Sequence, residues 1–368
     1  MSPAAAGGYR PRIATVIGNR PQFVKAAGVS RLLRECADEV LVHTGQHHDD
    51  ELSRVFFDEL GIPAPDRQLG AGEGTNSAQT ARMLAALEPE LDDIAPDLVL
   101  VYGDTNSTLA GALAARQAGR ALAHVEAGMR SFDRSMPEEL NRVLVDHASD
   151  LLLCPTDAAV ANLEREGLGG RTRLVGDVMA DVSLAFGAVA EQRSRVLSQL
   201  DLEPGAFLLA TAHRAGNVDD PARLERLVEL LEALPEPTVL PLHPRTRARL
   251  DAAGLMQRLE TAPRVLLSAP LGYLDFLVLA RHARAVLTDS GGVQKEAYLL
   301  GTPCVTLRDT TEWVETVESG WNELVDLDRD AALAALGRPV PPVRPKLYGG
   351  GHAGGRIRDL LCSYTQAR

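Results

Sequence analysis

The sequence predicts an α/β protein made of two doubly wound, parallel-sheet domains. Short runs rich in Val, Ile and Leu alternate with longer amphipathic runs, which is the pattern of repeated strand–helix units. This alternation pauses once, near residues 177–190, and then restarts. The length of 368 residues also exceeds that of one ordinary domain.

The expected elements follow from where apolar runs stop at turn residues. In the first half we expect strands over residues 13–17, 40–43, 98–102, 121–125 and 151–154, with helices such as 21–35 and 77–91. After residues 174–176 we expect one helix over 178–200, and then strands over 207–211, 239–242, 265–268, 286–288, 304–307 and 323–325. The expected organisation is a flexible leader, two Rossmann-like domains and a C-terminal helix that returns to the first domain: residues 1–12, 13–180, 181–350 and 351–368.

The composition argues against several classes of partner. A net charge of −12 is unfavourable for general binding to nucleic acid or an anionic membrane, although a local basic pocket for a phosphate is compatible with it. No run reaches the length of a membrane span, and residues 1–12 lack the apolar core of a signal peptide. The four cysteines lack C-x-x-C spacing and are typical of reduced cytoplasmic thiols rather than of a disulfide framework or zinc site: Cys36, Cys154, Cys304 and Cys362. Adjacent His47 and His48 point in different directions and predict no metal site.

The loop after the strand over residues 286–288 is the strongest candidate for binding a ligand. Ser290-Gly291-Gly292 leads directly into a helical pattern, so free amides and the positive helix end predict a phosphate site. The missing side chains of the two glycines let an anion approach the backbone. Glu296, one helical turn later, is suited to accept hydrogen bonds from a ribose diol. The alternative is an ordinary strand–helix turn in which the glycines only permit the backbone conformation and bind no ligand.

Other chemistry-bearing residues also follow strands. Arg20 precedes Pro21, the expected first helical residue, and can clamp a diphosphate, whereas a surface arginine there would oppose the helix dipole. Lys25, one turn later, is equally typical of a solvated or ion-paired lysine. His213 ends a strand and can stabilise leaving-group charge or shuttle a proton. His243 precedes a proline and is also compatible with simply bracing its loop.

Several carboxylates follow two neighbouring predicted strands in the sequence. Asp104 and Glu126 end these strands, and Glu138 and Glu139 follow shortly afterwards. Carboxylates crowded at one sheet edge cannot all ionise freely, so an acid and a base can coexist near neutral pH. Each residue also has a simpler explanation: Asp104 could cap a helix, and Glu138 and Glu139 could be ordinary acidic residues in the first turn of a helix.

Together these motifs resemble the non-hydrolysing UDP-N-acetylglucosamine 2-epimerases. The matching segments occur in order between about residue 13 and residue 356: G-N-R-P, T-G-Q-H, Y-G-D-T-N-S-T, H-V-E-A-G-M-R, M-P-E-E-L-N-R, A-H-R, D-S-G-G-V-Q-K-E and R-D-T-T-E. The resemblance implies a GT-B-like pair of Rossmann-like domains and a UDP-sugar substrate. It further implies a homodimer, no metal and no other cofactor. No G-x-G-x-x-G follows a strand and no P-loop motif occurs, so nicotinamide and P-loop chemistry have no support.

The resemblance also implies roles for particular residues. It places the acid/base carboxylates at Asp104, Glu126 and Glu138. It places His213 beside the diphosphate and Phe276 near the uracil. The remaining candidates for binding UDP or the substrate are Arg20, Lys25, His243, Ser290, Gly291, Gly292, Glu296 and Arg308.

The expected reaction is inversion of C2 of a UDP-2-acetamido sugar. The C2 proton beside an acetamido group is hardly acidic, so direct abstraction to a carbanion would be too slow. Breaking the C1–O bond to UDP acidifies that proton, which favours anti elimination to a 2-acetamidoglucal followed by re-addition of UDP. The route needs one cluster for the diphosphate and one for proton transfer. The sequence places them in different domains, so domain closure is expected.

Departures from the family pattern leave the sugar open between two candidates. In the epimerases that act on UDP-N-acetylglucosamine, R-D-T-T-E commonly continues Arg-Pro-Glu, but this chain continues Trp313-Val314-Glu315, followed by Gly320-Trp321-Asn322. Together with the segments G-N-R-P-Q-F and H-R-A, this continuation resembles the subgroup that acts on UDP-2,3-diacetamido-2,3-dideoxyglucuronate. Gly216 stands where a Glu is usual and Gly350 where an Asp is usual, so activation by a second UDP-sugar is also in question. UDP-N-acetylglucosamine conversion to UDP-N-acetylmannosamine is the first expectation. A hydrolysing epimerase, a GT-B glycosyltransferase and a non-enzymatic UDP-sugar sensor are the alternatives.

Overall fold

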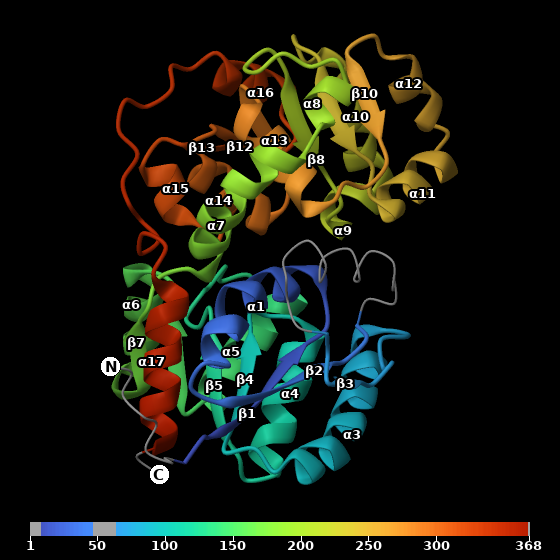
Figure 1. Cartoon of the computed structure of the whole chain (residues 1–368). Coiled ribbons are helices and arrows are strands. Elements are labelled where there is room, and N and C mark those ends of the chain that lie inside the picture. Colours follow the sequence, from blue (N-terminus) through green and yellow to red (C-terminus); the bar gives the residue numbers. More distant parts are fainter. Residues whose placement is uncertain (1–8, 47–63, 367–368) are drawn as a thin grey trace. The chain divides into compact units, whose positions relative to one another are not determined.

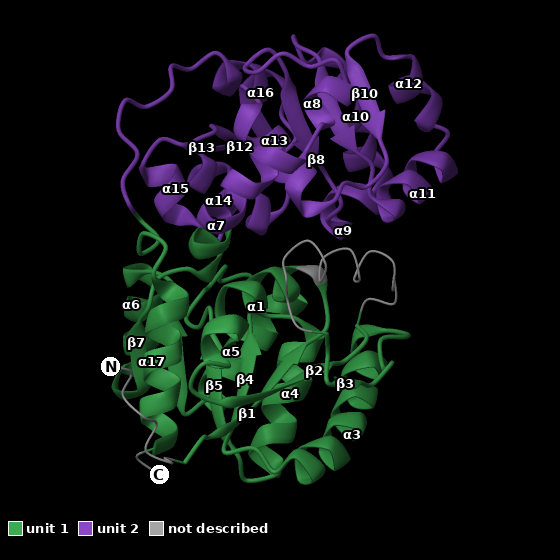
Figure 2. Cartoon of the chain, in the orientation of Figure 1, with its two compact units in different colours: residues 1–182, 347–368 green, residues 183–346 purple. Residues whose placement is uncertain are grey.

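The computed structural model describes residues 9–46 and 64–366, and the chain forms two compact units. Unit 1 comprises residues 1–182 and 347–368, and unit 2 comprises residues 183–346 (Figure 2). The sequence-based divisions fell at 180/181 and 350/351. Within the described part of the chain, no helix combines the length and the apolar character needed to cross a membrane.

Unit 1 is built on a seven-stranded sheet whose described strands all pair in parallel (Figure 1). The strand order is β3-β2-β1-β4-β5-β6-β7. Four of these strands are apolar and buried along all or nearly all of their length, as expected for a parallel sheet covered on both faces. The strands are β1 (Arg12–Ile17), β2 (Asp38–His43), β3 (Arg67–Gln68), β4 (Leu98–Tyr102), β5 (Ala121–Val125), β6 (Leu151–Cys154) and β7 (Thr172–Leu174).

The helices of unit 1 begin at well-defined caps. Asn19, Thr75 and Thr105 each accept a backbone N–H at the start of a helix, and Thr105 forms a full capping box with Thr108. The strand order reverses between β1 and β4, so right-handed crossovers place α1 on one face and α3, α4 and α5 on the other. The helices are α1 (Arg20–Leu33), α3 (Asn76–Ile94), α4 (Asn106–Gln117), α5 (Pro137–Ala148), α6 (Asp157–Arg165), the short η1 (Gly169–Arg171) and α17 (Ala353–Gln366).

Unit 2 repeats this architecture with six parallel strands in the order β10-β9-β8-β11-β12-β13. The strands are β8 (Leu208–Thr211), β9 (Thr238–Pro241), β10 (Val265–Ser268), β11 (Ala285–Thr288), β12 (Cys304–Thr306) and β13 (Asn322–Leu324). The helices are α8 (Val196–Gln199), α9 (Ala215–Val218), α10 (Pro221–Ala233), α11 (Pro244–Ala252), α12 (Met256–Thr261), α13 (Tyr273–His282), α14 (Gly291–Leu300), α15 (Val314–Glu318) and α16 (Arg329–Leu336). Leucine and valine side chains from β8, β11 and α10 form much of its core.

The predicted elements differ from the observed ones in several places. The single helix expected over 178–200 is observed as two helices, α7 (Val178–Arg193) and α8. The break occurs because the Ser194 hydroxyl accepts a hydrogen bond from the Val196 N–H, which interrupts the helical hydrogen-bond pattern. Helix α1 begins at Arg20 rather than at Pro21. Neither the two-residue strand β3 nor the three-residue strand β7 was expected, since their mostly polar sequences have no strand pattern.

The C-terminal helix α17 lies against α1 at a close backbone approach. A Cβ on Gly354 would come within 2.2 Å of the Gly28 carbonyl oxygen, so only glycine permits this contact. The Asp181 carboxylate caps the helix by accepting the Ala353 and Gly354 N–H groups at 3.1 and 2.7 Å.

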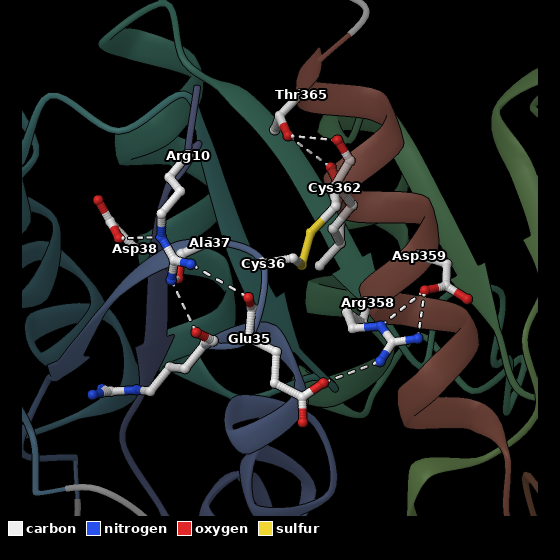
Figure 3. The surroundings of a disulfide bond; sticks show 11 residues. Arg10, Glu35, Cys36, Ala37, Asp38, Arg358, Asp359, Cys362 and Thr365 are labelled. Atoms are coloured by element: carbon white, nitrogen blue, oxygen red, sulfur yellow. Dashed lines mark hydrogen bonds and ion pairs between the residues drawn. A yellow bond between two sulfur atoms is a disulfide. The ribbon is translucent and has the colours of Figure 1, made fainter. Parts of the chain in front are cut away.

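A disulfide between Cys36 and Cys362 joins the end of α1 to α17 (Figure 3). Arg358 of α17 also donates to Glu35 beside it. The expectation of reduced thiols is therefore wrong for this pair, whereas Cys154 and Cys304 are free and buried. The two partners are 326 residues apart, and cysteine spacing alone cannot reveal such a pairing.

Candidate active site

The candidate residues lie at the two points where strand order reverses. Open α/β sheets bind ligands at the carboxyl ends of their strands, where neighbouring connections lead to opposite faces. In unit 1 this point lies between β1 and β4, and in unit 2 between β8 and β11. Asp104 follows β4 in unit 1, and in unit 2 His213 and Ser290 follow β8 and β11.

Asp104 is held by an arginine from α5. Arg142 donates to one Asp104 carboxylate oxygen from Nε and Nη2, at 3.0 and 2.6 Å. Asn141 donates to the Asp104 backbone carbonyl at 2.8 Å. The arginine is buried, but the Asp104 side chain keeps 29% of its surface exposed. Asp104 does not cap α4, since Thr105 does so, and its carboxylate therefore remains available to a ligand.

Glu126 follows β5 and forms an ion pair with Lys25 of α1. Both side chains are largely buried, with 12% and 13% exposed for the lysine and the glutamate. Glu126 also has a left-handed backbone, with φ 73°, which is uncommon for a residue other than glycine. Such strain is typical of functional positions. Lys25 is thus an ion-paired lysine beside an acid/base candidate, and this explains its burial.

The two glutamates at the start of α5 have different environments. Glu138 is half-buried, one helical turn before Arg142. Glu139 is buried and accepts the Ser131 and Phe132 N–H groups, the Ser131 hydroxyl and Arg142 Nη1. Glu139 therefore fixes the loop before α5.

The electrostatics of this edge differ from the like-charge crowding that the sequence suggested. Asp104 has Arg142 as its partner and Glu126 has Lys25, so each carboxylate is paired with a cation. Neither cation adjoins its carboxylate in the sequence, so these pairs could not be predicted from it: Arg142 is 38 positions from Asp104 and Lys25 is 101 from Glu126.

In unit 2, a buried carboxylate organises the loop that carries His213. Asp289 is fully buried and accepts the His213 and Arg214 backbone N–H groups at 3.1 and 3.0 Å. It also accepts from Asn217 Nδ2 at 3.3 Å. The His213 ring lies with Nδ1 3.6 Å from Asp289 and leaves 40% of its surface exposed. Asp289 thus ties the end of β8 to the end of β11 and presents His213 to solvent.

The turn after β11 opens α14, with Ser290 as the N-cap residue. Its hydroxyl makes no capping bond to the helix. A Cβ on Gly291 would lie 3.3 Å from both Glu312 Oε2 and Trp313 Nε1, so this position is packed rather than open. A Cβ on Gly292 would meet only Ser290 Oγ, at 3.9 Å. Of the two glycines, Gly292 is therefore the one that leaves room for a ligand.

Charged residues surround this turn. Arg308 donates to Glu312 at 3.0 and 3.4 Å, and Arg214 lies 3.8 Å from the same carboxylate. Buried Lys295 lies 4.1 Å from the centre of the Trp313 ring, a cation–π distance. Only three of the chain's 38 basic residues are lysines, namely Lys25, Lys295 and Lys346, and the first two occupy the two candidate sites.

The remaining predicted residues have mixed environments. Glu296 is buried in the second turn of α14. His243 accepts the Arg245 N–H as the cap of α11, and its ring stacks on His213 with centroids 5.3 Å apart. Phe276 is buried in α13. Arg20 opens α1, while His47 and His48 lie outside the described residues. No group of three or more metal-ligating side chains occurs within the described ranges.

Sequence reasoning missed several residues that shape these sites. Arg142 and Asp289 occur within the motifs but were assigned no role, and Glu139 was expected only as one of the crowded carboxylates. Gln22 of α1 was also missed: its side chain bridges the Gly18 N–H and the Tyr102 carbonyl across β1 and β4. The only signal for such residues is polarity within an otherwise apolar, buried segment.

Comparison with known proteins places these sites in one family. The sequence profile described as UDP-N-acetylglucosamine 2-epimerase matches residues 32–362. The chain belongs to the UDP-N-acetylglucosamine 2-epimerase family. This confirms the resemblance, and the members of this family are isomerases that act on carbohydrates.

Similar relatives carry two different substrate names. The UDP-2,3-diacetamido-2,3-dideoxy-D-glucuronate 2-epimerase of Pseudomonas aeruginosa is 48% identical over 95% of this chain and 99% of its own. A UDP-N-acetylglucosamine 2-epimerase homolog of Methanococcus maripaludis is 45% identical over the same shares of both chains. The crystal structure of Methanocaldococcus jannaschii UDP-GlcNAc 2-epimerase with UDP-GlcNAc and UDP is 40% identical, with a TM-score of 0.90 over 96% of this chain and 99% of that one. The fold is accordingly GT-B-like, with one Rossmann-like sheet in each unit.

Proposed function

We propose that this epimerase inverts C2 of a UDP-2-acetamido sugar by eliminating and re-adding UDP, without hydrolysis. The observation that carries the proposal is the pair of carboxylates, Asp104 and Glu126, each partly exposed and each held by a basic residue at one sheet edge of unit 1. A sensor or a glycosyltransferase that shares the UDP site would not need this pair.

The reaction divides into two proton transfers around one C–O cleavage. One carboxylate removes the C2 proton, whose electron pair forms the C1–C2 double bond as the C1–O pair leaves with UDP. The other carboxylate then delivers a proton to the opposite face of C2, and the UDP oxygen attacks C1. We assign the transfers to Asp104 and Glu126, with Glu138 as the third acid/base candidate. General acid–base catalysis of this kind contributes about 10²–10⁴-fold to a rate.

The diphosphate is proposed to bind at the start of α14 in unit 2. The helix-start amide of Gly292, together with the helix dipole, favours an anion there, whereas the Ser290 N–H is already donated to the Thr288 hydroxyl. His213, half-exposed on the loop fixed by Asp289, would stabilise negative charge on departing UDP. Glu296 is proposed for the ribose, with His243 and Phe276 as further contacts. Lys25, in contrast, is better supported as the partner of Glu126 than as a contact to UDP.

UDP-N-acetylglucosamine is the first proposed substrate, with UDP-N-acetylmannosamine as its product. The diacetamido-uronate nucleotide is the second candidate, supported by the relative that is 48% identical and by Trp313, which packs against the start of α14. We also propose a homodimer, which light scattering of the purified chain would test.

Incubation of the purified chain with each nucleotide sugar, followed by NMR of the products, tests the proposal. A mixture of the two C2 epimers, both still linked to UDP, supports it and identifies the substrate. Stoichiometric release of UDP with free N-acetylmannosamine would indicate a hydrolysing epimerase instead. UDP binding without turnover of either sugar would contradict the enzymatic assignment.

A further inference from the structure

A buried histidine next to the proposed acid/base residues has no role in the reaction described so far. His124 lies on β5, two residues before Glu126, with none of its surface exposed. Its Nδ1 is 2.7 Å from Asp146 Oδ1, and its Nε2 is 2.7 Å from the Gly103 carbonyl oxygen. Asp146 belongs to α5, and Gly103 immediately precedes Asp104.

The partners of the ring require a proton on both nitrogens. A backbone carbonyl can only accept, so Nε2 must donate to Gly103. Asp146 Oδ2 accepts from Arg130 and from the Gly128 N–H, and although burial alone would raise the pKa of Asp146, the guanidinium beside it helps to lower that pKa. The carboxylate is therefore ionised and also accepts at Nδ1. An imidazole that donates from both nitrogens is an imidazolium.

The surrounding charges balance this buried cation. Arg130 donates to Asp146 Oδ2 at 2.7 Å and makes two bonds of 2.8 Å to Glu166. The Gly128 N–H also donates to Asp146 Oδ2, at 3.1 Å. The cluster thus holds two cations, His124 and Arg130, against two carboxylates, Asp146 and Glu166, which satisfies the requirement that buried charges be paired.

The ring contacts the turn that carries Asp104. Gly103 has φ 65°, a conformation that favours glycine, and its N–H donates to the Val125 carbonyl at 3.0 Å. Both polar groups of the Gly103 backbone are therefore fixed by β5, one by the His124 ring and one by the next residue. Helix α5 holds the other side, through Asn141 and Arg142 on Asp104 and through Asp146 on the ring.

We propose that His124, kept as an imidazolium by Asp146, is a positioning residue that fixes the Gly103–Asp104 turn and so orients the Asp104 carboxylate. The role rests on the proposed function, because it matters only if Asp104 transfers a proton. His124 itself does not act on the substrate. Removing its contact frees the Gly103 carbonyl, and a shift of about 1 Å in a reacting group can cost about 10²-fold in rate.

Two variants remove the charge while keeping hydrogen-bonding capacity. His124→Gln keeps an amide donor for Gly103, and Asp146→Asn keeps an acceptor for Nδ1. We expect each to lower kcat about 10²-fold, with KM changed by less than about threefold and UDP affinity unchanged. The control is His147→Gln, the same substitution at an exposed histidine of α5 that contacts Glu166. It should retain full activity.

NMR of the ring nitrogens supplies a readout that does not depend on turnover. In ¹⁵N-histidine-labelled wild type near pH 7, His124 should show both nitrogens in the imidazolium range and protonated, and Asp146→Asn should convert it to a neutral ring. A neutral His124 in the wild type, or full kcat in His124→Gln, would overturn the positioning role alone. If His124→Gln lowered kcat and UDP affinity to a similar extent, His124 would have only a structural role and the proposal would be wrong. Absence of C2 epimerisation in the wild type would instead overturn the proposed function, and the role with it.

Discussion

Unit 1 and unit 2 both place a carboxylate at a reversal point of a parallel sheet, but the two carboxylates have different partners. In unit 1, Asp104 is bonded to a side chain, Arg142, and keeps 29% of its surface exposed. In unit 2, Asp289 is fully buried and bonded to the backbone N–H groups of His213 and Arg214. A carboxylate that is saturated by backbone donors serves the scaffold, whereas one left partly exposed is available for proton transfer.

The largest effect is expected from Asp104→Asn. The substitution preserves the shape of the side chain but removes its ability to exchange a proton, so kcat should fall by about 10³-fold. UDP affinity, measured by calorimetry, should stay unchanged because the residues proposed for UDP, apart from Arg20, lie in unit 2. The matched control is Asp93→Asn at an exposed site of unit 1. Equal losses of kcat and UDP affinity would contradict the division between the units.

Lys25→Met should have the next largest effect. It removes the cation paired with Glu126 and should lower kcat by about 10²-fold, because a mostly buried carboxylate binds a proton more tightly when a neighbouring positive charge is lost. Lys25→Arg should recover little activity, since the larger, planar guanidinium must fit a site where the lysine side chain keeps only 12% of its surface exposed. Exposed Lys346→Met is the control. Wild-type kcat in Lys25→Met would show that the ion pair has no catalytic role.

Asp289→Asn should affect binding more than chemistry. The neutral amide weakens the bonds to the His213 and Arg214 N–H groups, and the loop that carries His213 should loosen. We expect the Kd for UDP to rise by about tenfold, which corresponds to about 1.4 kcal/mol. Asp219→Asn, an exposed carboxylate of the same unit paired with Arg245, should leave the Kd unchanged. A change confined to kcat would place Asp289 in the chemistry instead.

The smallest effect on turnover is expected from opening the Cys36–Cys362 bridge. Helix α1 ends away from the carboxyl ends of the strands, so Cys36→Ser should leave kcat unchanged. It should lower the free energy of unfolding by about 2–4 kcal/mol. A thiol assay on the native, unreduced wild type should find almost no reactive groups, since burial raises the pKa of Cys154 and raises the pKa of Cys304 to about 12. Two rapidly reacting thiols in the native protein would contradict the bridge.

The fold could be predicted well from the sequence because its strands are buried on both faces. Continuous apolar runs such as those of β4, β5 and β6 mark such strands directly, and glycines or polar residues mark their ends. The expected strands over residues 98–102, 121–125 and 151–154 match the observed bounds. Strands β3 and β7 were missed because they depend on pairing with a neighbouring strand, and the break between α7 and α8 was missed because it depends on one serine side chain.

The candidate sites were predictable only in part, for a related reason. Asp104, Glu126, His213 and Ser290 could be found because each follows a strand, where parallel sheets bind ligands. Their partners could not, because Arg142 and Lys25 approach from helices distant in the sequence. The disulfide has the same origin: it depends on α17 lying beside α1, which cysteine spacing does not encode.

The central claim is that the enzyme breaks the C1–O bond between the sugar and UDP, exchanges the C2 proton with solvent, and then rejoins UDP to the sugar. UDP-N-acetylglucosamine labelled with ¹⁸O at the bridging anomeric oxygen, incubated with the enzyme in D₂O, tests both events in one sample by NMR. We predict deuterium at C2 in both epimers, together with movement of the label into non-bridging positions of the β-phosphate. The diacetamido-uronate nucleotide should give the same result if it is the true substrate. Epimerisation with no deuterium at C2 and the label retained in the bridge would contradict the account.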